Sequence, residues 1–141
     1  MHIQLLRTDT TSLKVDALVY PEESPELADG RAVVTTGGNL LCRFVIHVKV
    51  ARADEPDADA KLRQATIAAL ERAEELAIAS VGLPAIGGGP FGFDTERCAR
   101  VMLGATNDFK TRARSLQRAV FCLLGQEEFS TFERVLRELE S

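Results

Sequence analysis

The chain has 141 residues, of which 45% are hydrophobic and 27% are charged, and its net charge is −4. These values are typical of a globular protein with one core, and we expect a single domain over residues 1–141. The acidic balance argues against a nucleic-acid binder, and the lack of any 18-residue apolar run argues against membrane insertion and export.

The predicted elements begin with strands and alternate with helices after residue 57. Apolar and β-branched runs predict strands at 3–8, 15–20, 32–36, 43–50, 80–86 and 118–124, with a polar connection at 21–30. Apolar residues at i, i+3, i+4 and i+7 predict a long helix from about Asp57 to Ala79. A second helix begins at a cap on Asp94 or Thr95, and a C-terminal helix carries an apolar stripe from Phe129 to Leu139.

This order of elements predicts the fold class. The first four strands leave little room for helices between them, whereas the later strands are nearly continuous apolar runs separated by helices. The sequence therefore predicts an α/β protein, a three-layer helix/sheet/helix sandwich with a six-stranded mixed sheet.

The three cysteines, Cys42, Cys98 and Cys122, form no CxxC or Cys/His pairing of the kind that binds zinc. Their apolar neighbours and odd number favour buried, inert thiols in a reducing, cytoplasmic compartment. We expect neither a metal nor a cofactor.

The most informative stretch is residues 84–98, PAIGGGPFGFDTERC, which places three glycines between an apolar strand and a helix. Each glycine inside an element costs up to about 1 kcal/mol relative to alanine. The stretch is not a Walker A motif, because no Gly-Lys-Ser/Thr follows, and it lacks the βαβ frame of a dinucleotide fingerprint. Two interpretations stay open: backbone amides that bind a phosphate, or a tight turn.

Several segments together resemble the macrodomain family of ADP-ribose-binding modules. They are GRAVVTTGGNLLCRFVIHV from Gly30, LPAIGGGPFGFDTERCARVML from Leu83, and TDTT at 8–11 followed by VDALV at 15–19. The resemblance covers nearly the whole chain and implies the macrodomain-like sandwich.

The resemblance also implies a ligand site. Asp9 matches the aspartate that accepts a hydrogen bond from the adenine amine, although it is equally suited to cap a turn with Thr10 and Thr11. The loop Gly87, Gly88, Gly89, Pro90, Phe91 and Gly92 matches the segment that wraps the diphosphate, with Phe91 against the distal ribose. Phe91 and Phe93 are also suited to the core, and His47 matches a histidine that is generally structural.

The chain departs from the family pattern after its second strand. Tyr20-Pro21-Glu22-Glu23 replaces the family's N-A-A-N, and the glycine-rich first loop and its helix are missing. Carboxylates of Glu22, Glu23 and Glu26 repel a diphosphate if they point inward, and have little effect if they point to solvent. Gly125 stands where many members place an aromatic residue against adenine.

Three functions follow from these observations. The first is a binding module that holds ADP-ribose or a related nucleotide weakly and without catalysis, with an ADP-ribosylated protein as a further partner. The second is an ADP-ribosyl hydrolase that recruits Glu22 or Glu23 as base. The third is a scaffold that has lost ligand binding and acts through surface contacts or as a homo-oligomer.

Overall fold

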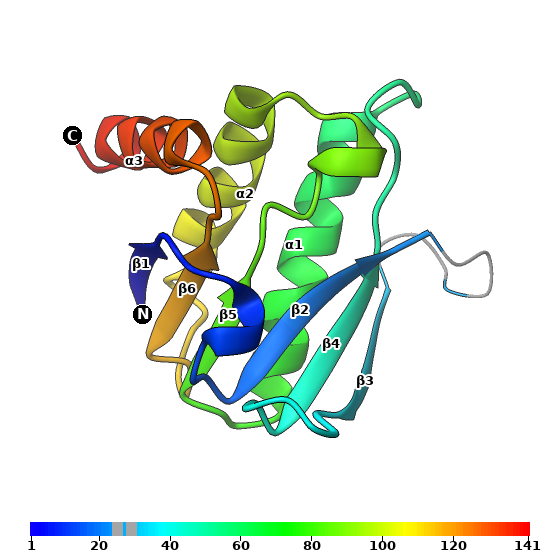
Figure 1. Cartoon of the computed structure of the whole chain (residues 1–141), viewed down its shortest axis with the longest axis vertical. Helices are drawn as coiled ribbons and strands as arrows, with labels where there is room; N and C mark the ends of the chain where they lie inside the picture. Colours follow the sequence, from blue (N-terminus) through cyan, green and yellow to red (C-terminus); the bar gives the residue numbers. More distant parts are fainter. Residues whose placement is uncertain (24–26, 28–30) are drawn as a thin grey trace.

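The sheet has six strands in the order β1-β6-β5-β2-β4-β3, seen in a computed structural model that describes residues 1–23, 27 and 31–141 (Figure 1). In this order each pair of neighbours among β1, β6, β5, β2 and β4 is parallel, and the edge strand β3 is antiparallel to β4. The strands are β1 (His2–Leu6), β2 (Ala17–Glu22), β3 (Ala32–Thr36), β4 (Phe44–Lys49), β5 (Ser80–Leu83) and β6 (Arg118–Cys122). The predicted mixed sheet is confirmed.

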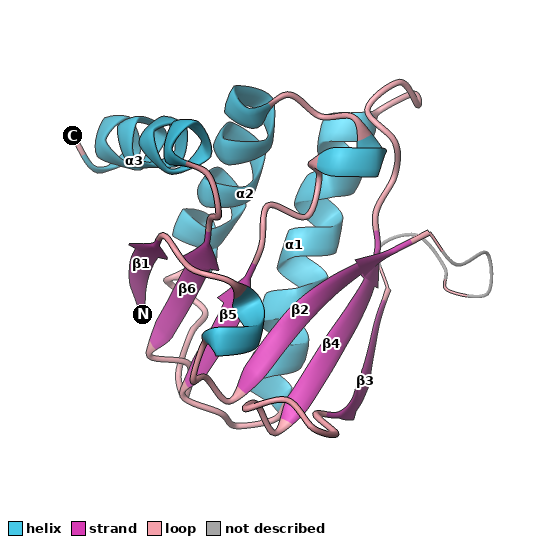
Figure 2. Ribbon diagram, in the orientation of Figure 1, coloured by secondary structure: helices cyan, strands magenta, loops and turns pink. Residues whose placement is uncertain are grey.

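Three α-helices pack against one face of this sheet: α1 (Ala58–Glu75), α2 (Thr95–Phe109) and α3 (Gln126–Glu140) (Figure 2). Leu62, Met102 and Phe132, one from each helix, are fully buried in the same cluster as Ile46 and Phe121 of the sheet. Asp94 caps α2 by accepting from the backbone N–H of Arg97 at 2.8 Å, as predicted. Because the three helices share one apolar cluster with the sheet, they form the thick layer of the sandwich.

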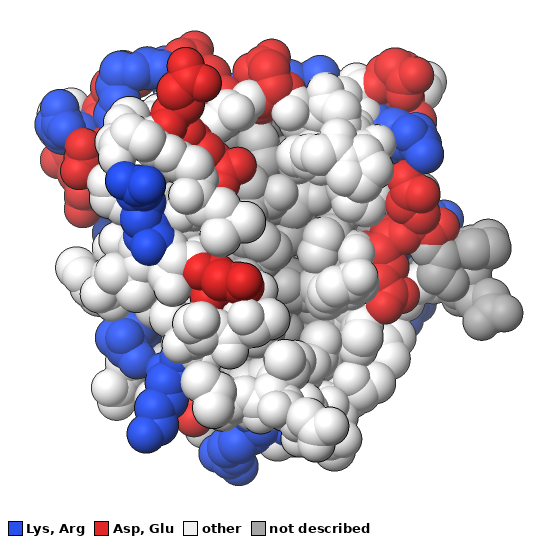
Figure 3. All heavy atoms as spheres, in the orientation of Figure 1, with Lys and Arg blue, Asp and Glu red and all other residues white. Residues whose placement is uncertain are grey.

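The other face carries a thinner layer. The short 3₁₀ helix η1 (Thr10–Ser12) and the loop after it place Leu13 and Val15 over the sheet. A Cβ at Gly82 would lie 2.7 Å from Leu13 Cδ2, so the close approach of this loop requires glycine. Figure 3 views this face, where charged atoms lie mainly around the edge. Beyond the loop the sheet is uncovered, and Tyr20 is 58% exposed.

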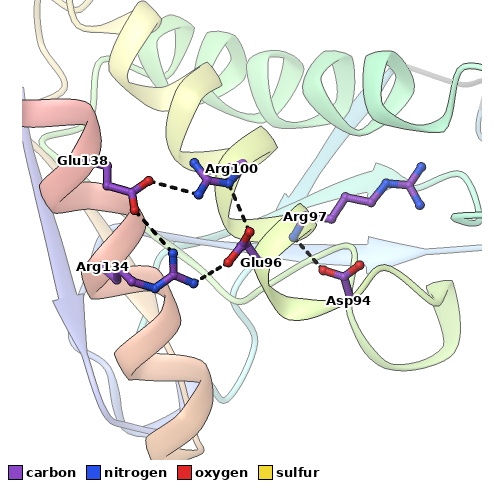
Figure 4. Close-up of polar contacts among 6 residues, drawn as sticks. All are labelled: Asp94, Glu96, Arg97, Arg100, Arg134 and Glu138. Atoms are coloured by element: carbon purple, nitrogen blue, oxygen red, sulfur yellow. Dashed lines mark hydrogen bonds and ion pairs between the residues drawn. The ribbon is translucent and has the colours of Figure 1, made fainter.

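The seam between α2 and α3 is held by a network of ion pairs (Figure 4). Arg134 contacts both Glu96 and Glu138, and Arg100 Nη2 lies 3.0 Å from Glu138 Oε2. Hydrogen bonding to Arg134 is the main cause that lowers the pKa of Glu96. The network therefore joins the first turn of α2 to the last turns of α3.

A second polar cluster fixes the end of α1 to the loop that precedes β6. Glu74 accepts hydrogen bonds from Ser115 Oγ at 2.6 Å and from the backbone N–H groups of Arg114, Ser115 and Leu116 at 2.9–3.2 Å. These donors, led by the Ser115 hydroxyl, lower the pKa of Glu74 from its usual 4.5 to about 2.

All three cysteines are buried and unpaired, as predicted. Burial raises the pKa of Cys98 to about 12 and that of Cys122 to about 11, so neither thiol ionises near neutral pH. Among the described residues, no helix is long and apolar enough to cross a membrane.

Candidate functional site

A trough crosses the carboxyl ends of β5 and its neighbours, where ligands of open α/β sheets bind. It consists of two hollows, of about 520 and 290 Å³, that share Pro84, Ala85 and Gly88. The larger is also lined by Tyr20, Pro21, Glu22, Glu23, Ile86, Pro90 and Phe91, and the smaller by Thr8, Asp9, Thr10, Gly89, Cys122, Leu124 and Glu128. Figure 3 shows the middle of this face hollowed between uncharged atoms. The structure thus brings Asp9 and the glycine loop, 78 positions apart, to one trough.

The glycine loop forms a turn that only glycine adopts easily. Gly89 has φ +57° and Gly92 has φ +84°, and they flank the short helix η2 (Gly89–Phe91). A Cβ at Gly87 would lie 3.0 Å from both Leu62 and Phe93, so this glycine lets the loop approach α1. The tight-turn interpretation therefore accounts for Gly89 and Gly92 by their backbone conformation and for Gly87 by its close approach to Leu62 and Phe93.

The amides of the loop face inward, which differs from the expected array of free donors. The N–H groups of Gly88, Phe91, Gly92 and Phe93 donate to carbonyls of the loop itself or of Ala85 at 3.0–3.3 Å. Pro90 has no N–H, and Gly87 donates to the sulfur of Cys98. Within the described part of the chain, Gly89 is the loop residue whose N–H has no recorded acceptor. A phosphate at this loop meets few donors unless η2 unwinds.

Asp9 caps η1, as the turn-capping interpretation predicts. Its Oδ1 accepts from the N–H of Thr11 at 2.9 Å, and Oδ2 has no recorded hydrogen bond to the described residues. Since Asp9 also lines the smaller hollow beside Gly88 and Gly89, one carboxylate oxygen holds the turn while the other remains for a donor in the trough.

The two phenylalanines of the loop differ in their surroundings. Phe91 lines the larger hollow although it is only 5% exposed, and its carbonyl accepts from the N–H of Ala53 at 2.8 Å. Phe93 is buried beneath the guanidinium of Arg97, which lies 4.6 Å from the ring centroid. Phe91 therefore reaches both the core and the trough, whereas Phe93 belongs to the core.

Two carboxylates at the carboxyl end of β2, Glu22 within the strand and Glu23 directly after it, border the larger hollow, and each is held by a basic partner. Glu22 Oε1 lies 2.6 Å from His47 Nδ1, and His47 Nε2 lies 2.8 Å from the Thr35 hydroxyl. Glu23 Oε1 accepts from Arg52 at 2.8 Å. Both residues line the hollow, and their side chains are 30% and 49% exposed. Glu26, to which the same prediction applies, and Gly30, the first residue of the GRAVVTTGGNL motif, lie outside the described residues.

Arg52 is the residue that sequence reasoning missed. Besides Glu23 it donates to the carbonyl of Pro90 at 3.1 Å, and so ties the acidic segment to the glycine loop. No local pattern marks it, because its partners lie 29 and 38 positions away in the sequence.

The electrostatic character of the trough is acidic. Glu22 and Glu23 lie at one end and Asp9 and Glu128 at the other, and among the described residues that line either hollow there is no lysine or arginine. The described residues also contain no group of three His, Cys, Asp or Glu side chains placed to share a metal ion. The lining therefore offers carboxylates and apolar walls, and favours ligands whose negative charge is small or compensated.

Gly125 is the N-cap of α3 and lies three residues after the end of β6. A Cβ there would meet nothing within 4 Å, and its neighbour Leu124 is 70% exposed in the smaller hollow. The position predicted to have lost its aromatic residue is thus open space beside the trough.

Comparison with known proteins gives consistent results for sequence and structure. A family model described as Macro domain matches residues 9–102. A protein of Sulfolobus acidocaldarius is 31% identical over 94% of this chain and 72% of its own length. A protein of Saccharolobus solfataricus is 30% identical over 78% of this chain, and the match spans 60% of that relative. The structure of an Oceanobacillus iheyensis macrodomain with ADP superimposes with a TM-score of 0.89 at 17% identity, over 96% of this chain and 90% of that one.

Proposed function

The chain belongs to the Macro domain family, and on that premise we propose that residues 1–141 form one domain that binds ADP-ribose or a related nucleotide weakly and without catalysis. An ADP-ribosylated protein is the natural macromolecular partner of such a module. The cytoplasm is the compartment that fits its buried thiols.

One observation carries the proposal: Asp9 and Phe91 lie at opposite ends of one trough with the glycine loop between them. In this arrangement Asp9 Oδ2 accepts from the adenine amine, the Gly87–Gly92 segment with Pro90 borders the diphosphate, and Phe91 supports the distal ribose. The Oceanobacillus iheyensis macrodomain, which shares the fold, was crystallised with ADP. The likeness in fold supports the placement of the nucleotide in the trough. Within the trough, Asp9 is the proposed contact for the adenine and Phe91 the proposed contact for the distal ribose.

Three features make the binding weak. Most amides of the loop are already bonded internally, no basic side chain is found among the lining residues that the structure describes, and Gly125 offers no ring for the base. A hydrogen bond to a charged group contributes about 1.5–3 kcal/mol, and a base stack about 1–3 kcal/mol. Losing even two such contributions weakens a micromolar ligand to about the millimolar range.

Calorimetric titration with ADP-ribose, with AMP as the comparison ligand, tests the proposal. Saturable binding that AMP does not reproduce is expected, and no heat with either ligand up to millimolar concentration would contradict it. The informative variant is Asp9→Asn, because the amide oxygen still caps η1 while the amide nitrogen meets the adenine amine donor with another donor. We expect at least a fivefold loss of affinity with little change in Tm.

Gly104→Ala is the matched control for this titration. Gly104 lies inside α2, away from the trough, and a Cβ there meets nothing within 4 Å. Alanine stabilises a helix by about 0.5–1 kcal/mol relative to glycine, so the control raises Tm and leaves the affinity unchanged.

One observation favours the hydrolase as a second candidate. The hydrogen-bonded chain Thr35–His47–Glu22 holds a carboxylate at the end of the trough where the distal ribose lies in the proposed pose. A carboxylate so fixed is suited to act as a general base toward water. Release of ADP-ribose from a modified protein, lost in Glu22→Gln, would establish this activity. No release by the wild-type protein would exclude it.

A further inference from the structure

We propose that the trough prefers nucleotides whose distal ribose carries a cationic ring, the chemical class of oxidised pyridine dinucleotides, over ADP-ribose. The inference rests on the proposed function and concerns only the larger hollow, beside Glu22 and Glu23. It assigns to these two carboxylates the role of selecting the ligand by charge.

The shape of the larger hollow leaves room for a ring beyond the ribose. Its volume of about 520 Å³ falls within the range of about 300–1,000 Å³ that small-molecule sites occupy. Tyr20, Pro21, Ile86 and Phe91 give it apolar and aromatic walls. Such walls suit a flat heteroaromatic ring, and aromatic faces attract a cation.

The two carboxylates are held in place at the border of this hollow. Each uses one oxygen for its partner, Glu22 for His47 at 2.6 Å and Glu23 for Arg52 at 2.8 Å. Their second oxygens have no recorded hydrogen bond to the described residues. The Glu22 side chain is 30% exposed, so its field is less screened than that of a free surface carboxylate, whereas the Glu23 side chain is 49% exposed and water screens its field more strongly.

The positive charge of Arg52 does not make the Glu22/Glu23 end of the trough positive. It lines a neighbouring hollow together with Lys49 and Glu55, and only Glu23 lines both hollows. The cation of Arg52 therefore compensates Glu23 from outside the larger hollow. Among the described residues that line the larger hollow, the charged groups are the carboxylates of Glu22 and Glu23.

The charge of the whole trough leads to the same preference. Asp9 and Glu128 at the far end add two more carboxylates, and the described lining residues include no lysine or arginine to offset a diphosphate. ADP-ribose brings two negative charges into this field. A dinucleotide with a pyridinium ring brings one fewer net charge and places its cation beside Glu22 and Glu23.

NAD⁺ and NADH provide the test, because they share one skeleton and differ at the ring by one hydride and therefore by one charge. In calorimetric titration at low salt we expect NAD⁺ to bind more tightly than ADP-ribose and about tenfold more tightly than NADH, and the ratio of NADH to NAD⁺ dissociation constants to shrink toward one at about 1 M NaCl. The double variant Glu22→Gln/Glu23→Gln keeps an acceptor for His47 and for Arg52 and removes both charges. It should bring the ratio to within about twofold.

Glu128→Gln is the matched control, since it removes a carboxylate at the opposite end and should shift the affinities of NAD⁺ and NADH by the same factor. Equal binding of NAD⁺ and NADH to the wild-type protein, with ADP-ribose still bound, overturns this inference and leaves the proposed function intact. A preference for NAD⁺ that survives in the double variant also overturns it. If no nucleotide binds at all, the proposed function and the inference fail together.

Discussion

At the scale of single residues, the site is defined as much by what is missing as by what remains. Asp9 caps η1 through Oδ1 and also lines the smaller hollow, while its Oδ2 has no recorded hydrogen bond to the described residues, so its two predicted roles are compatible in one conformation. Gly125, in contrast, leaves open space where a ring would rest against the base. Its φ of −92° is accessible to any residue, so glycine is not required there by the backbone.

Gly125→Phe should therefore strengthen ADP-ribose binding. A stacked ring adds about 1–3 kcal/mol, which corresponds to an increase of roughly five- to 150-fold in affinity, measured by calorimetry. Gly125→Leu is the control, because it adds apolar bulk without a π face and should give a smaller gain. If phenylalanine and leucine have the same effect, the base does not lie at this position.

At the scale of elements, the α2–α3 seam shows how surface charges align helices. Glu96, Arg100, Arg134 and Glu138 are each about half exposed, so water and salt weaken every pair. The network joins two helices that also share the apolar core through Met102 and Phe132. We therefore expect the apolar contacts to supply most of the stability of this seam and the ion pairs to make a small, salt-dependent addition.

Glu96→Gln tests how the stability of the α2–α3 seam is divided between apolar contacts and ion pairs. The substitution removes the charge that contacts both Arg134 and Arg100, so Tm should fall by a few degrees at low ionic strength. The difference from wild type should disappear near 1 M NaCl because the pairs are screened. Glu133→Gln, which breaks a pair within α3 alone, is the control and should have a smaller effect. A loss of Tm that persists in high salt would contradict an electrostatic origin.

At the scale of the whole molecule, the two faces of the sheet are unequally covered. Three helices cover one face, whereas η1 and its loop cover part of the other and leave Tyr20 and Val33 exposed. Most of the stability must therefore come from the helical layer. The cluster around Glu74 ties the end of α1 to the chain entering β6, and thus links that layer to the sheet.

The low pKa of Glu74 predicts how global stability depends on pH. Since the folded pKa is about 2 and the usual value is 4.5, the carboxylate stabilises the native state fully above about pH 4.5. This contribution is lost as the pH falls from 4.5 toward 2, where the unfolded chain binds the proton first. Glu74→Gln should lower Tm by several degrees at pH 7, and the difference from wild type should vanish near pH 2.

Glu75→Gln is the neighbouring control for this pH series. Among the described residues Glu75 pairs with Arg72 alone, at 3.0 Å, and its own side chain is 63% exposed, so its replacement should change Tm little at any pH. A difference between wild type and Glu74→Gln that stays constant from pH 7 to pH 2 would show that the carboxylate is not the group responsible.

The sequence by itself determined the strands and helices, the mixed sheet and the family, because periodicity, caps and contiguous motifs such as PAIGGGPFGFDTERC are local properties of the chain. Only the tertiary structure decided that the loop amides turn inward, that Arg52 reaches Pro90 across 38 positions, and that Glu22 and Glu128 lie at the ends of the same trough. Such contacts depend on how distant segments pack. The net charge of the trough is the sum of the charged side chains that all of these segments bring to it. The family therefore follows from the sequence, whereas the set of charged residues that line the trough follows from the fold.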